Sequence, residues 1–243
     1  MQHSWRGRIG LVILSPNTTI EYEFARMMPE GVWFHTARCF LPDVSDKDEK
    51  VKLLNDLDAK VVEAAQRVAT ARPDVILFAC TIGSFLKGIG HDRDLSDRIT
   101  EATSIPAITT TTAVLEALEH ANCRGLTLVS PYHPEAGRAE QEFLERQLSP
   151  LKVLGHKHLD IIGVMEKGML PPWSAYQAVC DVLHPETDGI FISCTNWRSM
   201  EIVPLLERDT GLPVITSVQA SLWACLKRIG VMGGEEFGRI FSW

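Results

Sequence analysis

Short apolar runs alternate with longer segments of mixed polarity along the chain, and this alternation predicts the secondary structure. Runs with so few polar residues are typical of parallel strands that are covered on both faces. They fall at residues 8–14, 32–40, 74–79, 105–109, 124–129, 151–157, 188–193 and 212–216. The segments between them predict helices at 18–28, 50–71, 92–103, 112–122, 134–149, 172–184, 197–210 and 218–229. Strands that alternate with helices indicate an α/β fold with right-handed crossovers.

The segment 50–71 carries the clearest helical pattern. Leu53, Leu57 and Val61 recur at helical spacing, and charged residues occupy the positions between them. This spacing predicts a single amphipathic helix with one apolar face.

The chain also repeats itself. An apolar run ends in Cys80-Thr81, and a second ends in Cys194-Thr195, with an aspartate six residues before each cysteine. The segment 10–16 matches 125–131 at nearly the same offset, and 105–113 matches 212–220 in the same order. Such ordered self-similarity indicates a duplicated unit.

We therefore predict two pseudo-symmetric α/β units, each with a parallel four-stranded sheet, and an active site in the cleft between them. Residues 1–112 plus 217–243 would form the first unit, which carries Cys80, and residues 113–216 the second, which carries Cys194. In open α/β sheets, ligands bind beyond the carboxyl ends of the strands.

Hydroxyl, amide and thiol residues gather at these strand ends. Neutral donors at helix N-termini suit an anion, especially a carboxylate. Serine, threonine and asparagine also favour helix N-caps, so any one of them can serve only its helix. The repetition of the whole set in both halves favours a binding site. The set comprises Ser15 to Thr19, Cys80-Thr81, Thr109 to Thr112, Ser130 to Tyr132, Cys194 to Asn196 and Thr216-Ser217.

Cys80 and Cys194 are the candidate reactive groups. Each stands at the end of a predicted strand, where the chain turns toward the helix that follows, and a helix N-terminus stabilises a thiolate and lowers the thiol pKa. Two opposed thiols suit proton removal on one face of a carbon and delivery on the other. Alternatively, one thiolate adds to an activated double bond. Two buried, unreactive cysteines are the bland alternative, which the matching Asp-x5-Cys-Thr frames disfavour.

Charge and composition exclude several classes of function. The net charge is −7, and no basic stripe exists to bind nucleic acid. No apolar run reaches the ~18 residues of a membrane span, and the N-terminus has no apolar signal region. We expect a cytoplasmic chain with reduced cysteines and a homo-oligomeric assembly. His156 and His158 are the closest pair of zinc ligands, and a solvated strand face explains them better.

The strand-end motifs resemble the aspartate/glutamate racemase superfamily, and most closely its maleate cis-trans isomerase and arylmalonate decarboxylase branch. The resemblance covers nearly the whole chain. It implies that Cys80 is a nucleophile and Cys194 its acid/base partner, and that neither a cofactor nor a metal is used. It also implies a small carboxylate substrate held by Asn17, Tyr132 and the threonine-rich turns, which contribute Thr81, Thr110, Thr111, Thr195 and Asn196.

Several activities fit this resemblance, and maleate to fumarate isomerisation through a Cys80 adduct leads. A racemase of aspartate, glutamate or a hydantoin also uses two cysteines. The decarboxylase keeps only the second-half cysteine, so Cys80 argues against it. A non-catalytic carboxylate-binding protein would not need paired thiols. Two departures concern the substrate: no asparagine occurs around 162–165, and Trp197 stands where a smaller residue is expected.

Overall fold

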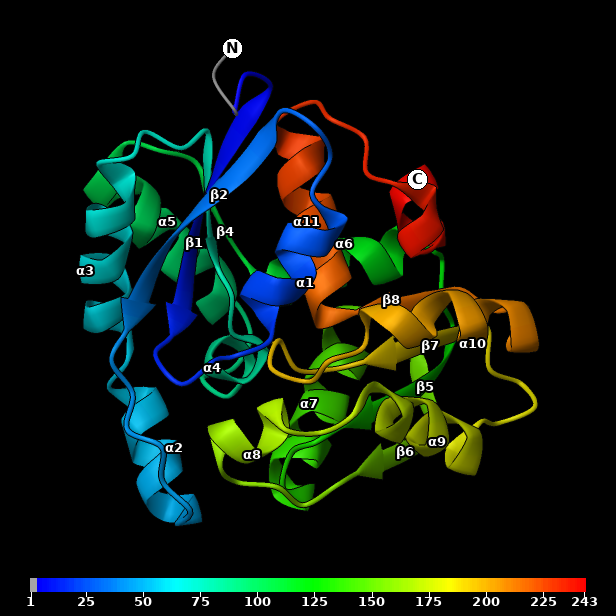
Figure 1. Cartoon of the computed structure of the whole chain (residues 1–243). Coiled ribbons are helices and arrows are strands. Elements are labelled where there is room, and N and C mark those ends of the chain that lie inside the picture. Colours follow the sequence, from blue (N-terminus) through cyan, green and yellow to red (C-terminus); the bar gives the residue numbers. More distant parts are fainter. Residues whose placement is uncertain (1–3) are drawn as a thin grey trace.

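The computed structural model describes residues 4–243 and contains two parallel four-stranded sheets (Figure 1). The first has the order β2-β1-β3-β4 and the second the order β6-β5-β7-β8, so the two topologies are the same. This confirms the predicted fold class and all of the predicted strands. Their bounds are β1 Gly7–Leu14, β2 Val32–Cys39, β3 Val75–Phe78, β4 Ala107–Thr109, β5 Gly125–Ser130, β6 Lys152–His158, β7 Gly189–Ile192 and β8 Val214–Thr216.

Burial differs from strand to strand, and the edge strands β4 and β8 are nearly as buried as the inner strands. The inner strands β3 and β7 are buried at every position, which explains their continuous apolar sequence. The edge strands β2 and β6 are partly exposed and carry polar residues. The aspartates that precede the two cysteines in the repeat make the same kind of hydrogen bond in both halves. Asp74 accepts a hydrogen bond from Arg8 N at 2.8 Å, and Asp188 accepts one from Arg124 N at 2.9 Å, far from the strand ends that carry the cysteines.

Helices connect the strands and cover the sheets (Figure 1). Those that follow the first four strands and their loops are α1 Ile20–Met27, α2 Lys47–Asn55, α3 Asp58–Ala69, α4 Thr81–Phe85, α5 His91–Thr103 and α6 Thr110–His120. The second half contributes α7 Pro134–Gln147, α8 Val164–Gly168, α9 Pro172–Val182, α10 Val203–Thr210 and α11 Ser217–Arg228, with 3-10 turns η1 Met200–Ile202, η2 Glu235–Phe237 and η3 Arg239–Ser242.

The prediction of one helix over 50–71 is wrong, because two helices meet there. The Asp46 side chain accepts from Glu49 N at 2.8 Å and starts α2 before the predicted position. At Asp56 the backbone leaves the helical region, with φ −89° and ψ 10°, and α3 starts at Asp58. The break lets α3 pack on the first sheet while α2 projects beyond the strand ends (Figure 1).

Two further differences concern the strand ends themselves. The short helices α4 and α8 form where no helix was predicted, since five residues are too few to show a helical period. The helix predicted over 197–210 starts later, at the 3-10 turn of Met200, so the chain after Cys194 is a loop.

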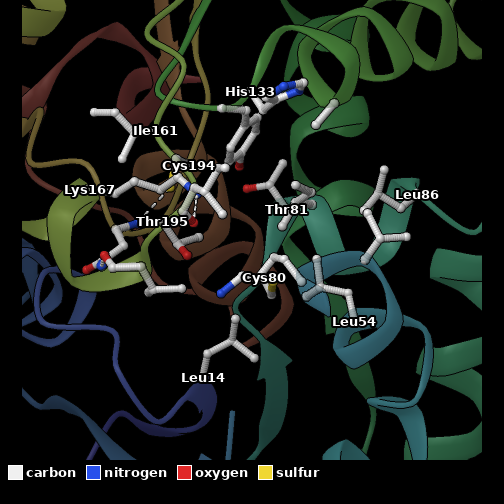
Figure 2. Close-up of a pocket in the computed structure, with 18 of the residues that line it drawn as sticks. Leu14, Leu54, Cys80, Thr81, Leu86, His133, Ile161, Lys167, Cys194 and Thr195 are labelled. Atoms are coloured by element: carbon white, nitrogen blue, oxygen red, sulfur yellow. Dashed lines mark hydrogen bonds between the residues drawn. The ribbon is translucent and has the colours of Figure 1, made fainter. Parts of the chain in front are cut away.

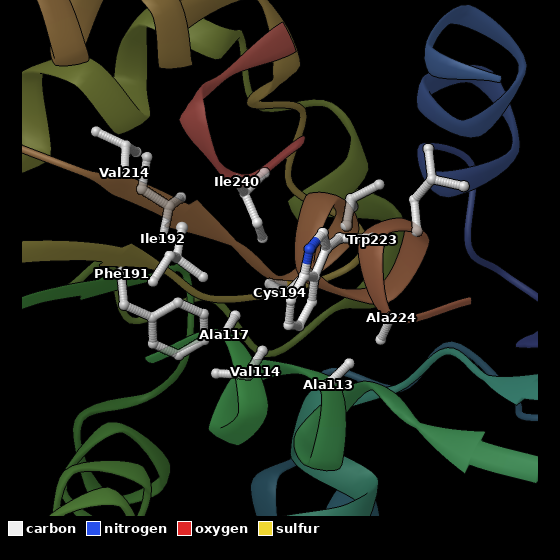
Figure 3. Packing of buried hydrophobic residues seen from close by; sticks show 14 of the residues in the cluster. Ala113, Val114, Ala117, Phe191, Ile192, Cys194, Val214, Trp223, Ala224 and Ile240 are labelled. Carbon is white, nitrogen blue, oxygen red and sulfur yellow. The ribbon is translucent and has the colours of Figure 1, made fainter. Parts of the chain in front are cut away.

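The two halves join through α6 and α11, which pack against each other at the centre of the molecule (Figure 1). Ala113, Val114 and Ala117 of α6 lie beside Trp223 and Ala224 of α11, together with apolar residues of the second sheet (Figure 3). One cluster of buried residues therefore crosses from one sheet to the other. The exact unit boundaries, 112/113 and 216/217, stay a prediction.

Within residues 4–243, no helix has the length and apolar character that crossing a membrane requires.

Candidate active site

A cavity of about 200 Å³ lies where the carboxyl ends of the two sheets face each other (Figure 2). Its size suits a small metabolite, since drug-sized ligands occupy roughly 300–1,000 Å³. Both candidate cysteines line it. Its other polar lining residues are Asn17, Lys47, Lys50, Thr81, Tyr132, His133, Glu135, Lys167, Thr195 and Asn196.

Cys80 lies at the end of β3 and is the N-cap residue of α4, in an extended conformation with φ −150°. Its side chain is 3% exposed. The Gly83 backbone N–H donates a hydrogen bond to the sulfur. A Cβ at Gly83 would lie 3.1 Å from Sγ, so glycine allows this close approach.

Cys194 has a different backbone. Its φ is 106°, a region that side chains rarely occupy, and such strain persists only where neighbours hold it. The Cys194 N–H donates to Ser217 Oγ at 2.9 Å, and Asn196 N donates to Cys194 Sγ at 3.4 Å. These contacts hold the thiol in the cavity although no helix starts directly after it.

The expectation that helix N-termini lower the pKa of both thiols is wrong. Burial raises the pKa of Cys80 to about 12 and raises that of Cys194 as well. The Gly83 N–H and the Lys50 ammonium offset only part of this rise at Cys80. Lys167, followed by the Asn196 N–H, does the same at Cys194. Desolvation therefore outweighs the local donors, and both thiols are protonated at neutral pH.

A hydrogen-bonded chain leads away from Cys194 into the protein. The Tyr132 hydroxyl contacts the Cys194 thiol and lies 3.4 Å from Ser193 Oγ. Ser193 in turn donates to Glu140 Oε1. Burial raises the pKa of Glu140 to about 8, so this carboxyl is mostly protonated at neutral pH. The second thiol is thus connected to a buried proton-bearing group.

Three predicted site residues join the two halves at the cavity wall. Asn17 Nδ2 donates to Thr195 Oγ1 at 3.3 Å, and Thr195 Oγ1 donates to Ala79 O at 3.2 Å. Asn196 Oδ1 accepts from Thr18 N at 2.9 Å, and Asn196 Nδ2 donates to Val164 O at 2.7 Å. The amide of Asn196 is therefore committed to protein groups, although the residue lines the cavity.

The predicted threonines divide into two groups. Thr81 lines the cavity, and its hydroxyl donates to Ser217 Oγ at 3.0 Å. The structure does not bring Thr110 and Thr111 to the cavity. Thr110 Oγ1 lies 2.8 Å from Ser221 Oγ, and Thr111 Oγ1 donates to Thr81 O at 3.1 Å. These two buried hydroxyls therefore link α6 to α11 and to α4 behind the site. Buried hydroxyl groups need hydrogen-bond partners, and these contacts provide them.

The two sequence departures have structural explanations. Trp197 is fully buried, and its Nε1 donates to Ser174 Oγ at 3.0 Å; it is absent from the described cavity lining. The segment that lacks an asparagine is followed by Lys167, whose ammonium donates to Ile162 O at 3.0 Å and lines the cavity.

Sequence reasoning missed both buried lysines of the cavity, Lys50 and Lys167. Lys50 is the first residue of the helix predicted over 50–71, and a lysine on an amphipathic helix usually faces solvent. One signal was available: each lysine follows the second strand of its half. The apolar side of the cavity was missed too, and it is formed by Leu14, Val51, Leu54, Ile82, Leu86, Ala136, Ile161, Ile162 and Val164.

No cluster of three or more histidine, cysteine or acidic residues arranged for a metal ion occurs within residues 4–243. The nearest pair considered from the sequence, His156 and His158, stacks with ring centroids 5.3 Å apart on the edge strand β6.

Comparison with known proteins places the chain in a family. A maleate isomerase of Pseudomonas putida is 26% identical over 235 residues, 91% of each chain. An arylmalonate decarboxylase of Bordetella bronchiseptica is 29% identical over 189 residues, 75% of this chain and 77% of the relative. A solved structure of Nocardia farcinica maleate cis-trans isomerase, a mutant with a covalently bound succinylcysteine intermediate, matches with a TM-score of 0.88 and 23% identity, over 97% of this chain and 98% of that chain. The sequence model of the arylmalonate decarboxylase family matches residues 9–241, and the chain therefore belongs to that family.

Proposed function

We propose that the chain catalyses the cis-trans isomerisation of maleate to fumarate through a covalent adduct at Cys80. The observation that carries the proposal is the presence of two thiols, one from each half, in one small cavity (Figure 2). Covalent addition needs one nucleophile, and the accompanying proton transfer needs one acid/base group.

The reaction follows from the surroundings of each thiol. Cys80 reacts as the thiolate, which forms when its thiol releases a proton to water. The thiolate adds to one alkene carbon, and the second carbon takes a proton from the Cys194 thiol, which leaves a saturated thioether. The former double bond between C2 and C3 is now a single bond, and rotation about it brings the carboxylates to opposite sides. The Cys194 thiolate then removes the proton, the carbon–sulfur bond breaks, and fumarate leaves as the Cys80 thiolate is regenerated.

The roles of the two cysteines follow from their contacts. Cys194 contacts Tyr132, and Tyr132 is linked through Ser193 to the protonated Glu140. When Cys194 loses its proton, these groups stabilise the negative charge on the sulfur. Cys80 contacts the Gly83 N–H and is near the Lys50 ammonium, and both favour a thiolate. The succinylcysteine intermediate of the Nocardia farcinica isomerase supports the same assignment of chemistry.

Arylmalonate decarboxylation is the second candidate, and the apolar side of the cavity favours it. Val51, Leu54, Ile82 and Leu86 form a surface on which an aryl group can pack. Decarboxylation needs one thiol to protonate a carbanion, and it leaves Cys80 without a role. The isomerase uses both thiols, and we favour it for that reason.

The test combines two measurements on the purified chain. Proton NMR in deuterated water follows maleate, aspartate and phenylmalonate separately, and intact-protein mass spectrometry follows quenched maleate reactions of wild type, Cys80→Ala and Cys194→Ala. We expect fumarate formation by the wild type only. A mass increase of one maleate should map to Cys80 and persist in Cys194→Ala.

Other outcomes would overturn the proposal in distinct ways. Deuterium at the α-carbon of aspartate, with no adduct, would identify a racemase. Loss of carbon dioxide from phenylmalonate, with full activity in Cys80→Ala, would identify a decarboxylase.

A further inference from the structure

Two lysines are buried in the wall of the cavity. The Lys50 side chain belongs to α2 and the Lys167 side chain to α8, and the two residues are 8% and 6% exposed. A lysine is rarely buried to this extent unless an anion pairs with it, because removing an ammonium from water is costly. Figure 2 shows Lys167 directed toward Cys194.

The two lysines occupy related places in the duplicated fold. Lys50 follows β2, one edge strand of the first sheet, and Lys167 follows β6, the corresponding edge strand of the second. Each lysine acts most directly on the cysteine of its own half: Lys50 on Cys80, and Lys167 on Cys194. The cavity therefore holds a pair of thiols and a pair of ammonium groups with the same pseudo-twofold relation.

Within residues 4–243, no carboxylate forms an ion pair with either lysine. Among residues 4–243, the Lys50 ammonium has no hydrogen-bond partner, and Lys167 Nζ donates only to the uncharged Ile162 carbonyl. Asp43 acts on both lysines and Glu166 acts on Lys167, but neither carboxylate forms an ion pair with them within residues 4–243, and the Asp43 oxygens accept from Val164 N and Met165 N. Two buried cations thus face one cavity with no ion pair in residues 4–243.

We propose that Lys50 and Lys167 each bind one carboxylate of the substrate, so that the site selects small dicarboxylates over monocarboxylates. The identity of the substrate as maleate rests on the function proposed above, whereas the selection of a dianion rests on the two lysines. Charge-assisted hydrogen bonds from each ammonium to a carboxylate would satisfy both buried cations at once. In this assignment the two lysines bind the substrate carboxylates, and Asn17 and Asn196 hold the two halves together.

Proton linkage gives the proposal an independent signature. Burial and the nearby Lys167 lower the pKa of Lys50 to about 8, and Asp43, Cys80 and Cys194 are the other groups that act on it. At pH 8.5 a fraction of the empty sites therefore lacks this proton. A bound dianion favours the ammonium form and raises its pKa, so binding should take up protons.

The experiment measures binding calorimetrically with succinate and butyrate, which share a four-carbon chain and differ by one carboxylate. Succinate has no double bond, so the chain cannot isomerise it. We expect wild type to bind succinate about thirtyfold or more tightly than butyrate, as expected for one buried charge pair. Titrations at pH 8.5 in two buffers of different ionisation enthalpy should report proton uptake with succinate.

Two variants and one control localise the effect. Lys50→Met and Lys167→Met should each weaken succinate binding about thirtyfold or more while leaving butyrate binding near the wild-type value, because one ammonium still remains for a single carboxylate. Proton uptake should disappear in Lys50→Met. Lys52→Met, an exposed lysine on the same helix, should bind both ligands as the wild type does.

The outcomes separate this proposal from the isomerase. Equal binding of succinate and butyrate by the wild type would overturn it, even if a variant failed to fold. Unchanged succinate binding in both folded variants would overturn it too. Lysine-dependent succinate binding by a chain that leaves maleate unchanged would refute the isomerase and retain the lysine assignment.

Discussion

The surroundings of Cys80 and Cys194 differ although the two residues occupy matching positions in the two halves. Cys80 has an extended backbone and faces the Gly83 N–H and Lys50. Cys194 has a φ of 106° and contacts Tyr132. Duplication therefore placed two thiols at one cavity, and the neighbouring side chains made them chemically unequal.

The inequality favours a division of labour between nucleophile and acid/base group. A racemase with symmetric roles would work best with two thiols in similar surroundings, each of which removes a proton from one enantiomer. Here Cys194 is connected through hydroxyl groups to the buried carboxyl of Glu140, whereas Cys80 faces a backbone N–H and an ammonium.

The largest expected effect comes from Tyr132→Phe. The variant keeps the ring, which packs 6.3 Å from the Phe85 ring, and loses only the hydroxyl between Cys194 and Ser193. We expect kcat for maleate to fall about 100-fold, the effect of removing one preorganised donor. Stopped reactions analysed by mass spectrometry should still contain the Cys80 adduct. An unchanged kcat, or loss of the adduct, would contradict the assignment of Tyr132 to the Cys194 side.

The second prediction concerns the other half and Gly83→Ala. The new methyl group would lie 3.1 Å from Cys80 Sγ and displace the thiol from its N–H donor. We expect adduct formation to slow about tenfold, since the lost contact is a hydrogen bond to a charged sulfur. Cys194 serves as the internal control: peptide mapping after iodoacetamide treatment should show slower alkylation at Cys80 and an unchanged rate at Cys194. Equal slowing at both would indicate a general distortion.

The third prediction tests the protonated state of Glu140. Its pKa is about 8 in the folded chain against an ordinary value of 4.5, so the folded state holds the proton more tightly. The contribution of Glu140 to stability is complete below pH 4.5 and is lost as the pH rises through about 8. In Glu140→Gln, the decrease in the free energy of unfolding from pH 5 to pH 8.5 should be smaller by more than about 1 kcal/mol. Denaturant unfolding at both pH values measures it, and an identical decrease in both proteins would show that Glu140 is ionised.

The smallest expected effect is on the thermal stability of Lys50→Met. Replacing a buried ammonium that has no hydrogen-bond partner among residues 4–243 with an apolar chain of similar length should raise Tm at pH 7, by about 2–4 °C for each kcal/mol gained. Because the pKa of Lys50 is lowered to about 8 from 10.5, the cost of the charge is full below pH 8 and disappears toward pH 10.5. The gain in Tm should therefore shrink between pH 7 and pH 10. Calorimetry with Lys52→Met as control tests this, and a lower Tm at pH 7 would mean that Lys50 stabilises the fold.

The sequence alone was sufficient for the architecture. Strands β3 and β7 carry no polar side chain, so they were predicted within one or two residues of their bounds. The repeat identified Cys80 and Cys194 as matched positions, because strands in the same topological place end at the same edge of their sheets. Both features are local patterns along the chain, and local patterns determine which segments become buried strands.

The tertiary structure decided what those patterns do not contain. Thr110 and Thr111 carry the same hydroxyl as Thr81, yet only Thr81 lines the cavity, because the packing of α6 against α11 turns the other two away. The break at Asp56 brings Lys50 over the site, where a continuous helix would have left it in solvent. The pKa values of both thiols rise because residues distant in sequence exclude water from them, and desolvation depends on the assembled environment rather than on neighbours along the chain.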